Sequence, residues 1–124
     1  MDTNTKIKSF TDLYTWREAH NLVLAVYEIT DLFPKREKFR LTSQLCRAVV
    51  SISSNIAEGF SRNSSKEKSQ FYAMSLGSLT EVENQLTIAR DLKYFPSEKF
   101  VKLTTQITTV NKLIHGLMKT ASNR

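Results

Sequence analysis

The chain contains few of the residues that form turns, disulfides or membrane-spanning segments. Only three glycines and two prolines occur in 124 residues, too few turn formers for a protein built from many short strands. The single cysteine, Cys46, excludes an intramolecular disulfide and indicates no oxidising compartment. No apolar run approaches the roughly 18 residues that cross a bilayer. The first residues also lack the apolar segment of a signal peptide, so we expect a cytoplasmic protein.

Motifs for catalysis and for cofactor binding are missing as well. Paired Cys-x-x-Cys, His-Glu-x-x-His and Walker-type glycine loops do not occur. A di-iron centre in a helical bundle needs Glu-x-x-His pairs, but a basic residue stands at the Glu position before both His20 and His115. A lone helical cysteine such as Cys46 is more often a small packed hydrophobe than a nucleophile. We therefore expect no enzymatic activity, no cofactor and no bound metal.

Hydrophobic periodicity and helix-end signals predict long helices joined by short connections. Ser9 and Asp12 form a plausible N-cap pair for the first helix, and Pro34 stops it. Gly59 is expected just beyond the end of the second helix, in the C′ position that glycine favours. A capping box from Ser64 to Glu67 opens the third helix. The predicted helices cover 10–32, 41–58, 65–93 and 97–121, within one domain over residues 1–124.

The fourth predicted helix has the most regular apolar pattern. Its apolar residues alternate steps of three and four: Phe100, Leu103, Ile107, Val110, Ile114, Leu117 and Ala121. Such a seam favours left-handed packing at shallow crossing angles. Long helices with short connections then predict an all-α fold, an antiparallel, left-handed, up-and-down four-helix bundle.

The third predicted helix is apolar on more than one face. One face carries Phe71, Ser75, Ser78 and Val82, and another carries Tyr72, Leu76, Leu79 and Leu86. A single bundle core does not readily bury both faces, so we expect a homo-oligomer. The alternative is that this long helix buries a wide face within its own bundle.

The second predicted helix carries a polar stripe beside its apolar face. The stripe residues recur within an arc of about 80°: Arg47, Ser51, Asn55 and Glu58. With Glu81 from the third helix, they would either form a hydrogen-bonded network that fixes helix register or line a surface that binds a ligand or partner. We favour the structural interpretation, because buried charges in bundles usually pair.

Positive charge is the main indication of function. Eighteen basic residues against twelve acidic ones give a net charge of +6. Basic surfaces attract phosphate backbones without reading sequence. The candidate nucleic-acid-binding residues are Lys35, Arg36, Lys38, Arg40, Lys99, Lys102, Lys112 and Lys119. The alternative is that these lysines and arginines only keep the protein soluble. The aromatic residues near them, Phe39 and Phe100, are expected to be core or boundary anchors, so we expect neither base stacking nor a strong preference for single strands.

Several motifs together resemble a known family. They comprise Phe10-x-x-Leu13-Tyr14-x-Trp16-x-x-Ala19, Phe33-Pro34-x-x-Glu37-x-Phe39-x-Leu41-x-x-Gln44-x-x-Arg47-Ala48, Ser51-Ile52-x-x-Asn55-Ile56-Ala57-Glu58-Gly59, Phe71, Ser75-Leu76-Gly77-Ser78 and Glu81. This pattern, from Phe10 to about Leu92, resembles the four-helix-bundle proteins encoded in intervening sequences of bacterial 23S ribosomal RNA genes. The chain departs from that family at Arg40, where glycine is common, at Cys46, where arginine is common, and at Ser53, where proline is common.

The resemblance implies a ring-shaped homopentamer and, with the basic composition, suggests a partner made of nucleic acid. It implies no established biochemical activity. The sequence therefore predicts a non-catalytic, oligomeric accessory protein that binds RNA or DNA through a basic surface. The alternative is an oligomeric protein–protein interaction module, with an unknown protein partner and no nucleic-acid role. Neither function involves a membrane.

Overall fold

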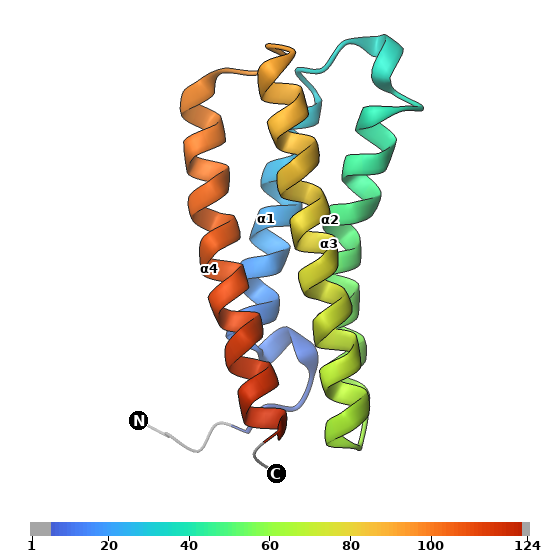
Figure 1. The fold of residues 1–124 in the computed structure, drawn as a ribbon. Helices are drawn as coiled ribbons and strands as arrows, with labels where there is room; N and C mark the ends of the chain where they lie inside the picture. The colour runs from blue at the N-terminus through green and yellow to red at the C-terminus, as the bar shows by residue number, and fades with distance from the viewer. Residues whose placement is uncertain (1–5, 123–124) are drawn as a thin grey trace.

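The computed structural model describes residues 6–122 as four long helices. They are α1 (Tyr14–Thr30), α2 (Leu41–Ser61), α3 (Ser65–Asp91) and α4 (Ser97–Ser122), with short 3-10 helices η1 (Phe10–Asp12) and η2 (Lys35–Glu37). Successive helices run in opposite directions, and α4 returns to pack against α1 (Figure 1). No strand occurs in the described residues. The predicted all-α, antiparallel four-helix bundle is thus confirmed.

The core runs along the bundle axis and takes aliphatic side chains from every helix. The largest fully buried ones include Leu22, Val26, Leu45, Val49, Ile52, Ile56, Leu79, Val82, Leu86, Val110 and Ile114. On α4, the predicted seam is buried at Leu103, Ile107, Val110, Ile114 and Ala121. The other two seam residues, Phe100 and Leu117, are partly buried against the core. The regular spacing therefore identified the inward face of α4 correctly.

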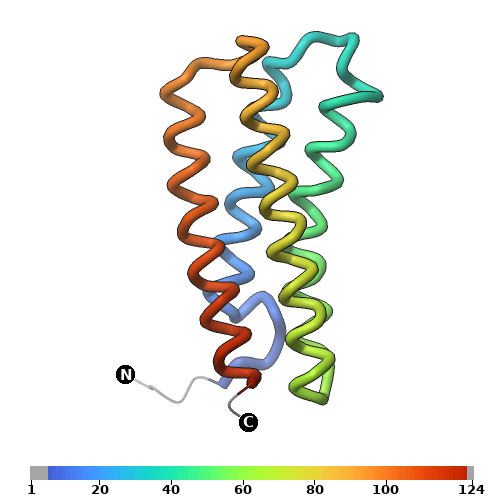
Figure 2. The backbone as a smooth tube through the Cα atoms, viewed as in Figure 1, coloured from blue at the N-terminus to red at the C-terminus, as the bar shows by residue number. Residues whose placement is uncertain are grey.

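Two of the connections lie together at one end of the bundle. The α1–α2 connection and the α3–α4 connection meet there, whereas the α2–α3 connection, η1 and the last turn of α4 lie at the other end (Figure 2). Aromatic side chains close the first end. The ring of Phe33 lies 5.4 Å from that of Tyr94 and 6.2 Å from that of Phe95, which in turn lies 6.5 Å from Phe100. These contacts fix the two connections relative to each other.

The start of the first helix differs from the prediction. Ser9 and Asp12 do form a capping box, in which the Ser9 Oγ accepts from the Thr11 N–H at 3.2 Å and the Asp12 carboxylate accepts from the Ser9 N–H at 3.1 Å. The box caps η1, however, and Leu13 adopts an extended conformation with ψ of 126° before α1 begins at Tyr14. The predicted continuous helix over 10–32 is therefore two elements, ending at Thr30.

Gly59 does not terminate the second helix as predicted. It lies inside α2, which continues to Ser61, and it is buried. A Cβ at this position would lie 2.5 Å from Cε1 of Tyr72 on α3. Gly59 therefore serves a close approach between α2 and the Tyr72 ring, and this tertiary contact overrides the usual C′ preference of glycine.

Replacing Gly59 with alanine tests this assignment. Because the Tyr72 ring is buried and a Cβ at Gly59 would overlap it, Gly59→Ala should destabilise the protein by about 1–3 kcal/mol through overpacking. Gly77→Ala is the matched control, because a Cβ there meets nothing within 4 Å. That change should stabilise the exposed interior of α3 by about 0.5–1 kcal/mol. Chemical denaturation measures both, and equal effects would contradict the close approach.

The α4 seam gives a second prediction about stability. Ile114 is fully buried, so Ile114→Ala should lower the free energy of unfolding by about 2–5 kcal/mol. Val101, on the opposite face of the same helix, is 63% exposed, and Val101→Ala should change stability by no more than about 0.5 kcal/mol. Urea denaturation of the two variants measures the difference. A loss at Ile114 within experimental error would mean that this face is not in the core.

Candidate functional site

The predicted nucleic-acid-binding residues are all exposed, but they do not form one patch. Four of them belong to the α1–α2 connection: Lys35, Arg36, Lys38 and Arg40. Lys99 and Lys102 belong to the first two turns of α4, at the same end of the bundle (Figure 2). Lys112 and Lys119 lie further along α4, and Lys112 is about 20 Å from Lys99 at the rise of an α-helix. The structure therefore divides the predicted set into an end cluster and two separate lysines.

Lys93 joins this end cluster, and the sequence did not identify it because the third helix was expected to include it. In the structure α3 ends at Asp91, and Lys93 adopts a left-handed conformation with φ of 63°. Its N–H donates to the Arg90 carbonyl at 2.9 Å, and the Tyr94 N–H donates to the Ala89 carbonyl at 3.0 Å. These are the bonds of a Schellman turn, in which glycine usually occupies the position of Lys93.

We refer to this cluster of exposed cations as the basic end. It comprises Lys35, Arg36, Lys38, Arg40, Lys93, Lys99 and Lys102. The acidic residues near it are Glu28, Asp31, Glu37, Asp91 and Glu98, of which only Glu37 is buried, and Glu28 lines a groove together with Lys99 and Lys102. Asp91 is engaged by the Arg90 guanidinium at 3.0 Å.

The buried carboxylate of Glu37 joins the two connections of the basic end. Its Oε2 accepts a hydrogen bond from the Tyr94 hydroxyl at 2.6 Å, and its Oε1 accepts from the Leu41 N–H at 3.3 Å. Leu41 is the first residue of α2, so Glu37 supplies the cap that the side chain of Arg40 does not. The Arg40 guanidinium lies 3.9 Å away. One carboxylate thus fixes η2, the start of α2 and the turn before α4.

These contacts also change the acidity of both partners. The hydrogen bond from Tyr94 lowers the pKa of Glu37, with further help from the Leu41 N–H and the nearby Arg40 and Arg36, while burial acts in the opposite direction. The pKa of the Tyr94 hydroxyl is raised, chiefly because its proton is held by Glu37. The Arg36 guanidinium lies 5.8 Å from the centre of the Tyr94 ring. At neutral pH the pair is therefore a carboxylate with a neutral phenol.

Phe39 does not occupy the core or boundary position expected for it. Its side chain is 84% exposed, and the Lys38 amine lies 5.3 Å from the centre of its ring. Glu37, two residues earlier in the same connection, is buried, whereas Phe39 faces outwards. The prediction was right only for Phe100, which is partly buried and covered by the Arg90 guanidinium at 4.4 Å.

Phe39 also lines an open groove with a volume of about 470 Å³ beside α1 and α2. We call it the aromatic groove, and its lining residues are Tyr27, Lys38, Phe39, Ser43, Cys46, Arg47 and Val50. The lining therefore contains aromatic rings and cations but no carboxylate. The sequence did not indicate this groove, because its residues come from separate helices and from the connection between them.

Two members of the predicted polar stripe hydrogen-bond within the bundle. The Asn55 amide donates to the carbonyl and the hydroxyl of Ser51, at 2.9 and 3.0 Å. The Ser78 hydroxyl on α3 donates to the Ser51 hydroxyl at 2.9 Å. One turn away, the buried Ser75 hydroxyl donates to the Ile52 carbonyl at 2.7 Å. Small hydroxyl side chains thus tie α2 to α3 and support the structural interpretation of this part of the stripe.

The charged members of the stripe lie at the surface instead. Arg47 and Glu81 are both exposed and line a shallow groove of about 380 Å³ between α2 and α3, together with Gln44, Ala48, Ser51 and Ser78. The Glu81 carboxylate accepts from the Gln85 amide at 3.3 Å. Within residues 6–122 no ion pair joins Arg47 to Glu81. A buried Arg47–Glu81 pair is therefore not part of this structure, because both side chains reach solvent.

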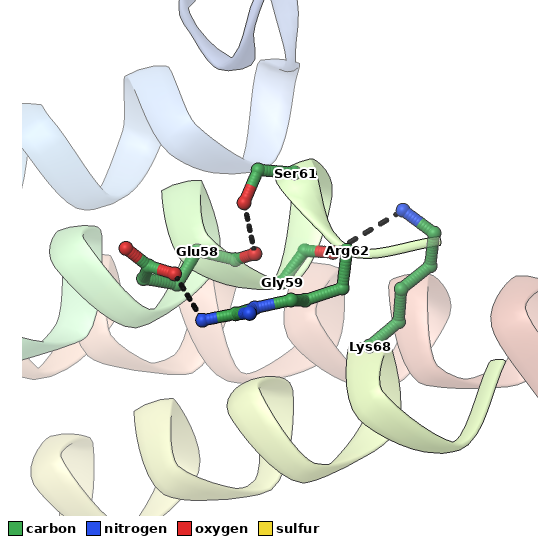
Figure 3. Close-up of polar contacts among 5 residues, drawn as sticks. All are labelled: Glu58, Gly59, Ser61, Arg62 and Lys68. Atoms are coloured by element: carbon green, nitrogen blue, oxygen red, sulfur yellow. Dashed lines mark hydrogen bonds and ion pairs between the residues drawn. The ribbon is translucent and has the colours of Figure 1, made fainter. Parts of the chain in front are cut away.

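Glu58 belongs to a polar cluster at the end of α2 (Figure 3). Its carboxylate pairs with the Arg62 guanidinium at 2.9 Å, and its carbonyl accepts from the Ser61 hydroxyl at 2.7 Å. From α3, the Lys68 amine donates to the carbonyls of Gly59 and Phe60, at 3.2 and 2.8 Å. A lysine at this position satisfies helix carbonyls and complements the negative end of the helix dipole. The cluster therefore holds the end of α2.

Two of the side chains considered for catalysis, His20 and Cys46, contact neighbouring side chains. The His20 ring stacks on Trp16 with centroids 4.7 Å apart, and the Cys46 Sγ lies 3.9 Å from the Thr30 hydroxyl. No cluster of three or more His, Cys, Asp or Glu side chains in the described part of the chain has the arrangement of a metal site. None of the described helices combines the length and apolar character that crossing a membrane requires.

The Glu37–Tyr94 contact predicts a specific dependence of stability on pH. Because the pKa of Glu37 is lowered from 4.5, its contribution to stability is present above that pH and is lost as the pH falls through the lowered value. Asp12, whose pKa is lowered by the Lys8 and Ser9 N–H groups, acts in the same direction. Glu37→Gln should therefore be less stable at neutral pH and lose less stability on acidification than the natural sequence.

Urea denaturation at neutral pH and at about pH 3 measures this difference. Glu83→Gln is the control, because it removes an exposed carboxylate on α3 outside this cluster. Its pH dependence should follow that of the natural sequence. Parallel behaviour of Glu37→Gln and Glu83→Gln would show that the Glu37 contact does not stabilise the fold.

Comparisons with known proteins agree with this architecture. The model of the 23S rRNA-intervening sequence protein family matches residues 11–116. The chain is also similar to a crystal structure from Bacteroides thetaiotaomicron, a protein of unknown function from the S23 ribosomal protein family. The two are 20% identical with a TM-score of 0.77, over 85% of this chain and 95% of that one, a likeness that shows the fold alone. No curated protein matches. Because the family match spans most of the sequence, the chain belongs to the 23S rRNA-intervening sequence protein family.

Proposed function

We propose that this protein is a non-catalytic, oligomeric, cytoplasmic accessory protein that binds RNA or DNA through the basic end. The observation that carries the proposal is the meeting of two connections and the start of α4 at one end of the bundle (Figure 1). Each segment contributes exposed lysine or arginine side chains there. A polyanion placed across this surface would release its condensed counterions, which supplies affinity without reading sequence.

The arrangement of charge supports a phosphate backbone as the ligand. The acidic residue in the middle of the cationic run, Glu37, is buried and hydrogen-bonded, so it does not present a carboxylate to an approaching anion. Its contacts with Tyr94 and Leu41 hold the connection in place. Cations on a fixed frame lose less conformational entropy on binding than cations on a mobile segment.

An oligomer would carry several copies of the basic end, each of which binds a polyanion weakly. Exposed apolar side chains occur on the outer faces of α1, α3 and α4, including Leu24, Met74, Ile88 and Val101. Contacts between unlike faces of neighbouring copies are the kind that close into rings. The family resemblance implies such a ring with five copies. Binding several basic ends to one strand would then raise the affinity through effective concentration.

The alternative function is an oligomeric protein-interaction module without a nucleic-acid role. The groove between α2 and α3 favours it, because Arg47 and Glu81 both line this groove without pairing with each other. Ionic strength separates the two functions. Phosphate contacts weaken steeply as salt increases, whereas a groove with one cation and one carboxylate releases few counterions, so binding of a protein there should depend on salt much less.

Neutralising cations in pairs tests the proposed surface. Lys99→Gln with Lys102→Gln should weaken binding to RNA and to DNA for all sequences alike. It should also flatten the dependence of log affinity on log salt by about 1.4–1.8 units, the expectation for two lost phosphate contacts. Lys112→Gln with Lys119→Gln is the matched control, because it removes the same charge from α4 outside the basic end.

Fluorescence titration of labelled oligonucleotides at several salt concentrations measures these slopes. The control pair should keep nearly the slope of the natural sequence. Equal effects of the two pairs would assign binding to net charge instead of to the basic end. If the natural protein binds neither RNA nor DNA at low salt, the protein-interaction function replaces the proposal.

A further inference from the structure

The side chain of Phe39 is exposed to solvent, and the packing of the fold does not explain why. At 84% it is the most exposed of the large apolar side chains in the described residues. It takes no part in the aromatic cluster that closes this end of the bundle, where Phe33, Tyr94 and Phe95 pack together. The connection is held by Glu37 instead. Removing the Phe39 ring would therefore cost the folded state little, and its place at the surface points to a ligand.

The neighbours of Phe39 are cations on both sides in sequence. Lys38 lies over its ring at 5.3 Å, and Arg40 follows it with an exposed guanidinium. This order of cation, ring and cation lies within the basic end. An aromatic ring between positive charges is the usual arrangement in sites for single-stranded nucleic acid, where bases stack while phosphates meet cations.

The aromatic groove extends this arrangement away from the connection. Tyr27 on α1 is 47% exposed and lines the groove opposite to the α2 residues Cys46, Arg47 and Val50. Two aromatic rings and two cations, Lys38 and Arg47, thus face one open volume of about 470 Å³ without a carboxylate among the lining residues. The groove has both the apolar surface that a base needs and the charge that a phosphate needs.

We infer that the aromatic groove binds unpaired nucleotides of RNA or single-stranded DNA, with one base stacked on Phe39 and flanking phosphates held by Lys38, Arg40 and Arg47. This inference rests on the proposed nucleic-acid function and names the form of its ligand. A paired base buries both faces against its neighbours in a duplex, so only loops, ends and single strands can offer a face to Phe39. The exposed ring reverses the expectation from the sequence, which was that base stacking and a strong preference for single strands are absent.

A second copy of the chain is a less suitable occupant of this groove. Docking an apolar helix face there would remove water from Lys38 and Arg47, and the lining supplies no carboxylate to compensate them. A phosphate backbone compensates both cations directly. Charge complementarity therefore favours the nucleic acid, and the alternative occupant becomes an outcome of the test.

Phe39→Ala is the informative variant, with Phe39→Trp as the conservative one. Affinities for a single-stranded oligonucleotide and for the duplex of the same sequence are compared at several salt concentrations. Phe39→Ala should weaken single-strand binding about 5- to 150-fold, the equivalent of one lost stacking contact, and leave duplex binding unchanged. Phe39→Trp should retain the affinity for single strands. Neither variant removes a charge, so the salt slopes should equal that of the natural sequence.

Leu92→Ala serves as the matched control, because Leu92 is 52% exposed near the basic end and lies outside the aromatic groove. It should change neither affinity. Denaturation midpoints establish that the variants are folded, and sedimentation establishes their oligomeric state.

Each result decides the inference. If the natural protein binds both ligands and Phe39→Ala weakens both equally or neither, the stacking site is wrong while the proposed function stands. If the natural protein binds neither ligand at low salt, the proposed function fails and the inference fails with it. If Phe39→Ala dissociates the oligomer without selectively weakening single-strand binding, the groove is a contact between protein chains.

Discussion

The buried carboxylate of Glu37 is the interaction on which the arrangement of the basic end depends. A carboxylate loses favourable hydration when it is buried, and it is tolerated only where hydrogen bonds replace water. Here the Tyr94 hydroxyl supplies one of those bonds from the α3–α4 connection, and the Leu41 N–H supplies the other from the start of α2. The same negative charge offsets some of the repulsion among the surrounding cations. A single side chain therefore joins the packing of the helix ends to the positive surface that they present.

The sequence predicted the fold well where the information is local and repeated. Seven apolar residues at steps of three and four identified the inward face of α4, and the Ser64 cap identified the start of α3. The errors lie where a contact distant in sequence overrides a local preference. The helix-end preference of glycine predicts a terminator at Gly59, but the missing Cβ instead makes room for the Tyr72 ring of another helix. No local pattern around Gly59 contains that ring.

The candidate site was predictable in composition but not in arrangement. Hydrophobic periodicity shows which way a side chain points around its own helix. It does not show which connections lie at the same end of the bundle. The predicted cations are exposed, yet Lys112 and Lys119 lie apart from the others, and the sequence did not indicate that Lys93 lies beside them. The stripe divides similarly, since Ser51 and Asn55 hydrogen-bond in the bundle while Arg47 reaches solvent. Hydrophobicity alone predicts the opposite of what the structure shows at two positions, because Glu37 is buried and Phe39 is exposed.

The left-handed conformation of Lys93 restricts which substitutions evolution can make at this position. A non-glycine residue in this conformation costs about 1–2 kcal/mol relative to the right-handed region. Replacing Lys93 with glycine would remove that cost, but it would also remove a cation from the basic end. Selection for a more stable fold and selection for a more positive surface therefore act in opposite directions at one position. A lineage under thermal stress would be driven towards glycine there, and one under pressure to hold a polyanion would keep lysine.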